Sequence, residues 1–262
     1  MSDVSDAARI QALEARLRAL EEEVADLNRG RSSTTRVDPA FYRLLEDRYR
    51  GDEASVRARV QPYATEIAGY RAALAEAAWA DFKVADLGCG RGELLSALAG
   101  AAIRAIGVDS NAEQTRGADI AGQEVVIADI LEFLADRPDG SLDVVIALHV
   151  IEHFDFSAQV LLLTHAARVL KPGGRLILET PNPENLRVGA WKFHIDPTHL
   201  KPLAPELLTL MVEHASFSDI RVARLHPEPE YEQVAAKANL PRHATLMLYG
   251  PRDFAVLARK PV

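Results

Sequence analysis

The sequence predicts an α/β protein built on a doubly wound, mostly parallel sheet. From Phe82 onward, short apolar segments typical of strands alternate with longer segments of helical spacing. Several of the apolar segments are continuous, such as the one from Val144 to Leu148, as expected for strands that are covered on both faces. A glycine-rich turn follows the first of these strands, at the place where such sheets bind their ligands.

The composition narrows the class of protein. The 262 residues suit one α/β domain with a small appendage, and the net charge of −8 disfavours a binder of nucleic-acid phosphates. Cys89 is the single cysteine, so an intrachain disulfide is excluded. The first residues lack the features of a secretory signal, and no apolar run approaches the roughly 20 residues of a membrane helix. We therefore expect a cytoplasmic protein without a nucleic-acid partner or a membrane span.

Residues 1–29 carry a heptad pattern on an otherwise charged segment. Apolar residues alternate spacings of three and four, which is typical of a coiled-coil seam; they are Ile10, Leu13, Leu17, Leu20, Val24 and Leu27. The pattern predicts a short coiled coil that joins two chains into a homodimer, and the alternative is a helix packed on its own domain. Residues 30–37 are typical of a flexible linker.

The rest of the chain is expected to form a helical cap over 38–80 and the main α/β domain over 81–262. The cap has helical apolar spacing with breaks near Gly51 and Pro62. In the main domain we expect a short helix or loop over 111–122 and an insertion over 227–252. The predicted strands cover 83–88, 103–109, 124–129, 142–150, 175–181, 217–226 and 253–260, and the predicted helices 92–101, 130–141, 157–174 and 204–215.

The glycine loop after the first strand indicates a ligand without phosphates. Gly88, Gly90 and Gly92 stand on alternate positions, and Glu93 occupies the position where a dinucleotide fingerprint has its third glycine. An acidic side chain at a helix N-terminus would repel a pyrophosphate. The Gly-Lys-Ser/Thr sequence of a phosphate-binding loop is also absent.

Acidic residues at the strand ends suit a nucleoside joined to an amino acid. Asp109 can accept both ribose hydroxyls, Asp129 can accept from an exocyclic amine beside the apolar edge of Ile130, and Asp86 can hold loop amides or an ammonium. This combination favours S-adenosylmethionine. The residues expected to bind it are Asp86, Gly88, Gly90, Gly92, Glu93, Asp109, Ser110, Asp129, Ile130 and Leu148.

The segments "VADLGCGRGELL", "AIGVDS", "VVIADI", "LDVVIALHVIEHF" and "VLKPGGRLILETPN" resemble those of class I S-adenosylmethionine-dependent methyltransferases. They stand in the same order and at normal spacings over Phe82–Lys260. The resemblance implies a Rossmann-like sheet of seven strands whose last strand is antiparallel. The two C-terminal segments of strand character fit that topology.

Two histidine-rich segments are expected to carry the chemistry. His149, Glu152 and His153 follow the fourth strand, and the loop after the fifth strand adds His194, Asp196 and His199. A histidine could act as general base toward a hydroxyl, or several groups could hold Mg²⁺ or another divalent cation. A purely structural role is the third alternative. We assign no role to His165, His214, His226 or His243.

This part of the sequence is similar to the E-x-x-E-H…H metal motif of ubiquinone-biosynthesis and small-RNA 2′-O-methyltransferases. Glu152, His153 and His199 match the motif, whereas His149 stands in place of its first glutamate. The tentative metal ligands are therefore His149, Glu152, His153 and His199.

The loop "DPTHLKP" and the ending "GPRDFAVLARK" resemble bacterial methyltransferases that act on polysaccharides. That resemblance implies a saccharide acceptor, such as a mannose-containing one, and cofactor contacts from Tyr42, Arg43 and Arg50. Trp191 and Phe193 beside the loop could stack on a sugar or anchor the loop in the core. The alternatives are an O-methyltransferase for a small phenolic or quinone-type acceptor and a non-catalytic assembly module that only binds the cofactor.

Overall fold

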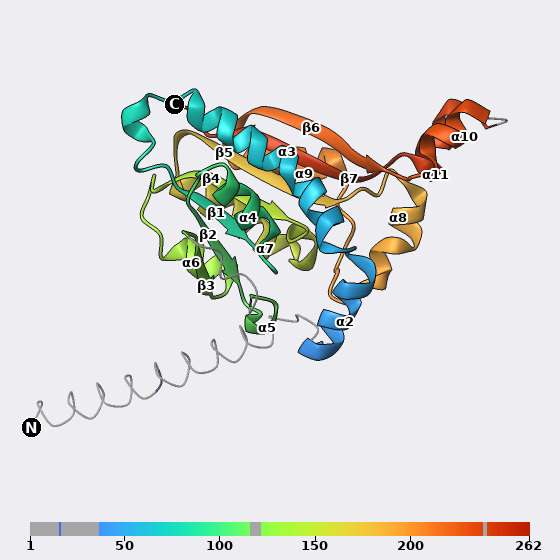
Figure 1. Cartoon of the computed structure of the whole chain (residues 1–262), viewed down its shortest axis with the longest axis horizontal. Coiled ribbons are helices and arrows are strands. Elements are labelled where there is room, and N and C mark those ends of the chain that lie inside the picture. The colour runs from blue at the N-terminus through green and yellow to red at the C-terminus, as the bar shows by residue number, and fades with distance from the viewer. Residues whose placement is uncertain (1–15, 17–36, 116–121, 238–239) are drawn as a thin grey trace, which may run out of the picture. The chain divides into compact units, whose positions relative to one another are not determined.

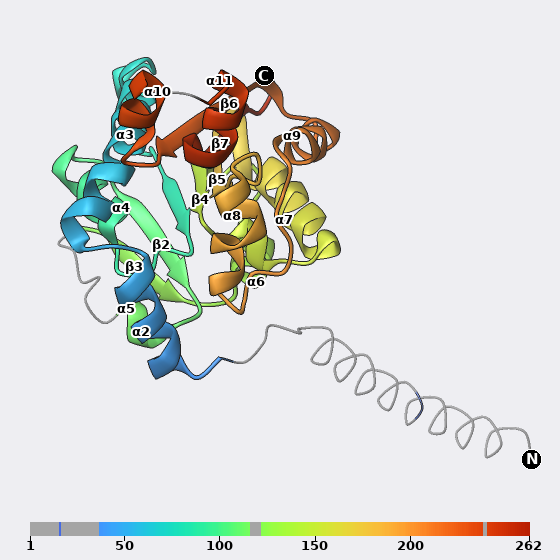
Figure 2. The ribbon, with the colours of Figure 1, turned by 90° about the vertical axis from the view of Figure 1, so that its right-hand side faces the viewer.

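The computed structural model describes residue 16 and residues 37–115, 122–237 and 240–262. Asp38–Val262 forms one compact unit, whose ribbon is shown in Figures 1 and 2. The predicted coiled coil and linker lie outside the described residues, apart from positions 16 and 37. The homodimer through residues 1–29 therefore stays a prediction.

A seven-stranded sheet with the order β3-β2-β1-β4-β5-β7-β6 forms the centre of this unit. Strands β1 to β5 pair in parallel, and β7 is antiparallel to both β5 and β6. This confirms the predicted Rossmann-like fold with its antiparallel last strand. The strands are β1 Val84–Leu87, β2 Ala105–Asp109, β3 Glu124–Ile127, β4 Leu142–Leu148, β5 Leu170–Pro181, β6 Ser218–Pro227 and β7 Pro251–Arg259.

Helices cover both faces of the sheet, with α3 and α4 on one side and α7 and α9 on the other (Figure 2). Because side chains alternate along a strand, Val144 packs toward α3 and α4 while Val145 packs toward α7. The central strands are therefore apolar on both faces, as predicted. The helices of these layers are α3 Glu53–Ala72, α4 Glu93–Gly100, α6 Ile130–Ala135, α7 Phe156–Val169 and α9 Pro205–His214.

Short helices connect the layers. Asp52 accepts a hydrogen bond from Ser55 N at 2.7 Å and caps α3, just after Gly51 with its φ of +100° ends the preceding helix. The remaining elements are α2 Pro39–Tyr49, η1 Glu76–Ala78, α5 Ala112–Thr115, η2 Ile151–His153, α8 Leu186–Ala190, η3 Lys192–Ile195, α10 Tyr231–Lys237 and α11 Arg242–Tyr249. No helix in the described ranges is long and apolar enough to cross a membrane.

Three expected boundaries were wrong. The helix expected over 130–141 ends at Ala135, because Pro138 disfavours helical geometry in the residue before it. The break expected at Pro62 does not occur, because Pro62 is exposed on α3 and water can take the carbonyl that a proline leaves unpaired. The helix expected to run to residue 174 ends at Val169, and Leu170 already belongs to β5. Hydrogen bonds from Gly173 N to Lys260 O and from Lys260 N to Gly174 O, both 2.9 Å, draw this segment alongside the end of β7.

Candidate active site

The glycine loop lies between β1 and α4 in close contact with other parts of the chain. Gly88 has a φ of +72°, and a Cβ there would overlap Val150 Cγ2. A Cβ on Gly90, whose φ is +52°, would lie 2.9 Å from Arg50 Nη1. The glycines were expected to clear space for a ligand. In this structure, Val150 and Arg50 occupy part of that space.

Arg50 connects the helical cap to this loop. Its guanidinium donates to Glu93 Oε2 at 3.2 Å, and Arg91 Nε donates to Glu93 Oε1 at 2.8 Å. Glu93 is only 4% exposed and begins α4, where the helix dipole also favours a negative charge. Glu93 was predicted to touch the cofactor; here its carboxylate is held by two arginines and binds the cap to the loop.

Asp86 is a buried acid near the end of β1. Burial raises the pKa of its carboxyl to about 8, although the nearby charge of Arg50 lowers it. Its carboxylate receives no hydrogen bond from the described residues. An ammonium group of a ligand would supply both the missing charge and the missing donors.

The other residues expected at the cofactor lie at the carboxyl ends of neighbouring strands. Asp109 accepts from Gly90 N at 2.9 Å and from Asn111 N at 2.8 Å, and Asp129 caps α6 through Leu131 N at 2.8 Å. Each carboxylate thus orders the turn that a nucleoside would meet. Of the other expected cofactor contacts, Ile130, Leu148 and Tyr42 are half-buried, whereas Ser110 and Arg43 are exposed.

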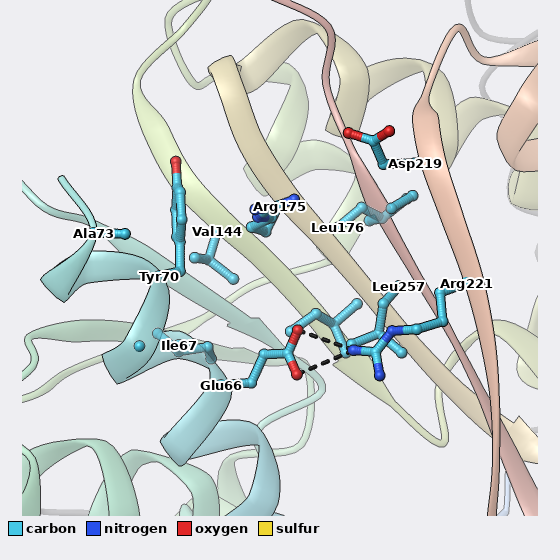
Figure 3. A pocket seen from close by; sticks show the side chains of 13 residues that line it. Glu66, Ile67, Tyr70, Ala73, Val144, Arg175, Leu176, Asp219, Arg221 and Leu257 are labelled. Carbon is cyan, nitrogen blue, oxygen red and sulfur yellow. Dashed lines mark hydrogen bonds and ion pairs between the residues drawn. The ribbon is translucent and has the colours of Figure 1, made fainter.

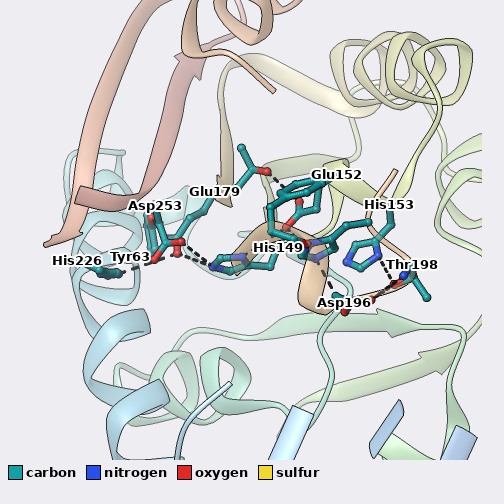
Figure 4. A network of polar contacts seen from close by, with 12 residues as sticks. Tyr63, His149, Glu152, His153, Glu179, Asp196, Thr198, His226 and Asp253 are labelled. Atoms are coloured by element: carbon teal, nitrogen blue, oxygen red, sulfur yellow. Dashed lines mark hydrogen bonds and ion pairs between the residues drawn. The ribbon is translucent and has the colours of Figure 1, made fainter. Parts of the chain in front are cut away.

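Two clusters of titratable side chains lie apart from the glycine loop (Figure 4). The first consists of Glu152, His153 and His199. Glu152 lies on η2, directly after β4, and is fully buried. Its Oε2 accepts from Thr180 Oγ1 at 3.0 Å, whereas its Oε1 has no hydrogen-bond partner. Its backbone oxygen accepts from Leu200 N at 2.9 Å, which fixes the His199 loop beside it.

The hydrogen bonds of the two histidines determine which nitrogen is free. Thr198 Oγ1 donates to Asp196 Oδ1 at 2.6 Å and therefore accepts from His153 Nδ1 at 2.8 Å. His199 Nδ1 donates to Phe193 O at 2.8 Å. We assign the lone pair of each ring to Nε2, and His199 Nε2 lies 3.9 Å from Glu152 Oε1. Three electron-pair donors therefore face one another, which is the ligand set of a two-histidine, one-carboxylate metal site.

His149 belongs to a second cluster rather than to the first. Its φ is +56°, and its backbone N donates to Glu179 O at 2.9 Å. Its ring Nε2 lies 3.1 Å from Glu179 Oε1, and its Nδ1 lies 3.4 Å from Glu152 Oε1. Burial lowers the pKa of His149, but its contacts with Glu152 and Glu179 outweigh burial and raise the pKa well above its usual value. A histidine held in its charged form cannot be the general base at neutral pH.

The pKa values of Glu152 and His199 are lowered for different reasons. Burial raises the pKa of Glu152, yet the charge of His149 lowers it to about 2. Burial lowers the pKa of His199, which therefore stays neutral and able to accept a proton or bind a cation. Of the two histidines, His199 is the better base.

Sequence analysis missed four residues of the second cluster. Tyr63 on α3 donates to Glu179 Oε2 on β5, Asp253 lies at the start of β7, and His226 lies near the end of β6. Glu179 and Asp253 could have been found, because the end of a parallel strand and the start of an antiparallel one meet at the same sheet edge. No sequence signal marks Tyr63 or His226.

The remaining residues of the histidine loop have separate places. His194 is exposed, and its ring lies edge-to-face with the Phe193 ring. The aromatic pair is divided, because Phe193 is 2% exposed and anchors the loop, whereas Trp191 is 60% exposed. Only Trp191 can stack on a ligand from solvent.

A separate cavity of about 370 Å³ lies between α3 and the strands β4, β5, β6 and β7 (Figure 3). An ion pair between Arg221 and Glu66, with Nη2 3.0 Å from Oε1, and the stacking of Arg175 on Tyr70 lie at its wall. None of the residues predicted to act in catalysis or cofactor binding lines it. We therefore place the candidate active site at the other ends of the strands.

Comparison with known proteins identifies the family. Residues 53–222 match a family described as a methyltransferase domain. A structure of an S-adenosylmethionine-dependent methyltransferase from Archaeoglobus fulgidus superposes with a TM-score of 0.71 at 30% identity, covering 84% of this chain and all of that one. The chain belongs to the S-adenosylmethionine-dependent methyltransferases. S-adenosylmethionine is the cofactor of this family, and the glycine loop with Asp86 fits its amino-acid part.

Curated methyltransferases are similar over shorter stretches. A probable S-adenosylmethionine-dependent methyltransferase of Mycobacterium tuberculosis is 31% identical over 158 residues, which cover 59% of this chain and 55% of the relative. A ubiquinone biosynthesis O-methyltransferase of Ralstonia nicotianae is 36% identical over 103 residues, covering 37% of this chain and 42% of that protein. The chain spans about half the length of the curated relatives it matches.

Proposed function

We propose that this methyltransferase transfers the methyl group of S-adenosylmethionine to a hydroxyl oxygen, and that a divalent cation at Glu152, His153 and His199 holds the acceptor. The observation that supports this most is Glu152 Oε1, which is buried without a hydrogen bond and faces the free nitrogen of His199 at 3.9 Å. His149 Nδ1, 3.4 Å away, is the charged neighbour of this oxygen, and a cation would add the direct contact that a buried carboxylate oxygen otherwise lacks.

The choice of cation follows from the ligands. Two imidazoles and one carboxylate suit Mn²⁺, Fe²⁺, Co²⁺ or Zn²⁺ better than Mg²⁺, which prefers oxygen ligands. Mg²⁺, which the sequence suggested as one candidate, is therefore the weaker choice. When bound, the cation would lower the pKa of an acceptor hydroxyl and orient it.

The chain itself contributes position and charge. Asp196 and Phe193 O fix the orientation of the two histidines through the contacts described above. The His149 imidazolium lies between Glu152 and Glu179 and keeps Glu152 ionised. The loop glycines and Arg50 place the cofactor, so that oxygen, methyl carbon and sulfur can come into line. In the chain without a cation, His199 Nε2 is the group placed to accept the hydroxyl proton.

For the acceptor we propose a saccharide with adjacent hydroxyls. A cation held by three protein ligands has free positions for two neighbouring oxygens, and the exposed indole of Trp191 can cover a sugar face. The similarity to ubiquinone biosynthesis O-methyltransferases favours a second candidate, a phenolic acceptor with two adjacent oxygens. Both candidates offer the same chelating chemistry.

Transfer of a labelled methyl group from S-adenosylmethionine distinguishes these candidates. The full chain is supplied with Mn²⁺ and given manno-oligosaccharides, gluco-oligosaccharides or a catechol, with and without a chelator. We expect methylation of a saccharide that the chelator reduces at least 100-fold. A W191A variant should lose activity toward saccharides only. Methylation of the catechol alone would refute the saccharide, and cofactor binding without transfer to any acceptor would indicate a non-catalytic assembly module.

A further inference from the structure

The second cluster lies beside the first and joins His149, the residue after β4, to side chains of β5, β6 and β7. Glu179 and Asp253 are 4% and 7% exposed and face His149 from β5 and β7. His149 Nε2 lies 3.1 Å from Glu179 Oε1 and 3.9 Å from Asp253 Oδ1. One ligand atom of each of the three residues lies within 4.8 Å of the others.

The polar groups of this cluster are incompletely satisfied. The Asp253 carboxylate receives no hydrogen bond from the described part of the chain, and its nearest cationic group is His149 Nε2 at 3.9 Å. His226 Nε2 is buried without a hydrogen-bond partner, 4.0 Å from Glu179 Oε1. Buried polar atoms are rarely left in this way, and a cation would satisfy both the carboxylate and the imidazole nitrogen.

We infer that the chain binds a second divalent transition-metal cation through His149 Nε2, Glu179 Oε1 and Asp253 Oδ1, with His226 Nε2 as a fourth ligand. Two imidazoles and two carboxylates are a normal donor set for Zn²⁺, Mn²⁺ or Co²⁺. The cation takes the place of the proton between His149 Nε2 and Glu179, and that proton leaves to solvent.

The surrounding residues already orient these ligands. The Tyr63 hydroxyl donates to Glu179 Oε2, which leaves Oε1 for the cation. His149 Nδ1 lies 3.4 Å from Glu152 Oε1, so the ring lies between a carboxylate and the second site. Glu152 therefore links the two sites, as ligand of the first and as neighbour of a ligand of the second.

The charge of the region supports a cation as the occupant. Glu152, Glu179 and Asp253 are all at least nine-tenths buried, and all three carboxylates approach the ring of His149. Three carboxylates close together in a region of low dielectric constant favour the binding of cations. The inference concerns metal binding alone and does not rest on the proposed acceptor.

Metal stoichiometry tests the inference. The full chain is stripped with a chelator and titrated with Mn²⁺ by calorimetry, and Co²⁺ absorption reports ligation by histidine. We expect two ions per wild-type chain. D253N should retain one ion and bind the second at least tenfold more weakly, whereas H153A combined with H199A should lose only the first.

Two further variants serve as an independent check and as a control. Y63F removes one hydroxyl from the second site and should weaken its ion about tenfold, even if D253N folds poorly. E184Q alters an exposed carboxylate paired with Arg224 and should change neither ion. The inference would be overturned if the wild type bound one ion and D253N and Y63F both kept it. It would also be overturned if the wild type bound one ion that was lost both in D253N and in the H153A–H199A variant. Loss of methyl transfer with two ions still bound would refute the proposed function and leave the second site standing.

Discussion

The two ends of the active site are built in different ways. At the cofactor end, one segment from Gly88 to Glu93 meets Asp109 and Arg50, and most of its polar groups are paired within the chain. At the end that we propose binds the acceptor, side chains converge from α3, η2, β5, β6 and β7, and Glu152 Oε1 and His226 Nε2 have no hydrogen bond. The end with the glycine loop is thus largely preorganised, whereas the proposed acceptor end holds buried polar atoms that a ligand could complete.

Removing the charge of Glu152 should have the largest effect on methyl transfer and should leave cofactor binding unchanged. E152Q keeps the shape and the hydrogen bond from Thr180 but deprives two imidazoles of their carboxylate. We expect methyl transfer to fall at least 100-fold, about 3 kcal/mol in the activation free energy. Calorimetry with S-adenosylmethionine should show an unchanged affinity, with E184Q as the control. A variant with more than a tenth of wild-type activity would exclude Glu152 from the reaction.

A methyl group on Gly88 should disturb the glycine loop and weaken cofactor binding. G88A forces a left-handed conformation on alanine and a clash with Val150, which together should cost about 2–3 kcal/mol of folding free energy. Cofactor affinity should fall with it, measured by calorimetry on protein that still melts cooperatively. The double variant G88A–V150A provides the internal check, because it removes the clashing methyl. If the double variant is no more stable than G88A, the close approach of Val150 is not the cause.

The difference between the two ends also explains which parts of the fold and of the site could be predicted from the sequence. The glycine loop is one contiguous segment with a strong signal, and the seven-stranded sheet with its antiparallel last strand was expected from the resemblance that this segment helps to carry. The acceptor end depends on which strands become neighbours, so Glu179 and Asp253 appear only once β5 pairs with β7. Glu93 shows the remaining difficulty, because nothing in the sequence indicates that its carboxylate pairs with Arg50 and Arg91, and its contact with the cofactor stays a prediction.

Ionisation of Asp253 should destabilise the folded chain when no metal is bound. Burial raises the pKa of Asp253 from 3.8 to about 6, so its ionisation costs more in the folded chain than in the unfolded chain. Stability is therefore lost as the pH rises from about 4 through 6. D253N cannot ionise, and we expect it to be about 3 kcal/mol more stable than wild type at pH 8 and equal to it below pH 4. Urea unfolding with a chelator present measures both. Saturating Mn²⁺ should reverse the order at pH 8, and a wild type that stays less stable with Mn²⁺ would contradict the metal role of Asp253.

A comparison of Arg50 with Arg43 should show whether cofactor affinity depends on the contact between the cap and the glycine loop or on positive charge alone. Arg43 and Arg50 lie on the same N-terminal segment, and the resemblance implied cofactor contacts for both. The structure distinguishes them, because Arg50 reaches Glu93 and Gly90 whereas Arg43 is exposed. R50A frees the buried Glu93 carboxylate from one partner and removes a positive charge that lowers the pKa of Asp86. We expect S-adenosylmethionine to bind R50A about tenfold more weakly, about 1.4 kcal/mol, and R43A within twofold of wild type. Equal losses in the two variants would mean that the segment acts through its overall charge and not through the contact that joins α2 and α3 to the glycine loop.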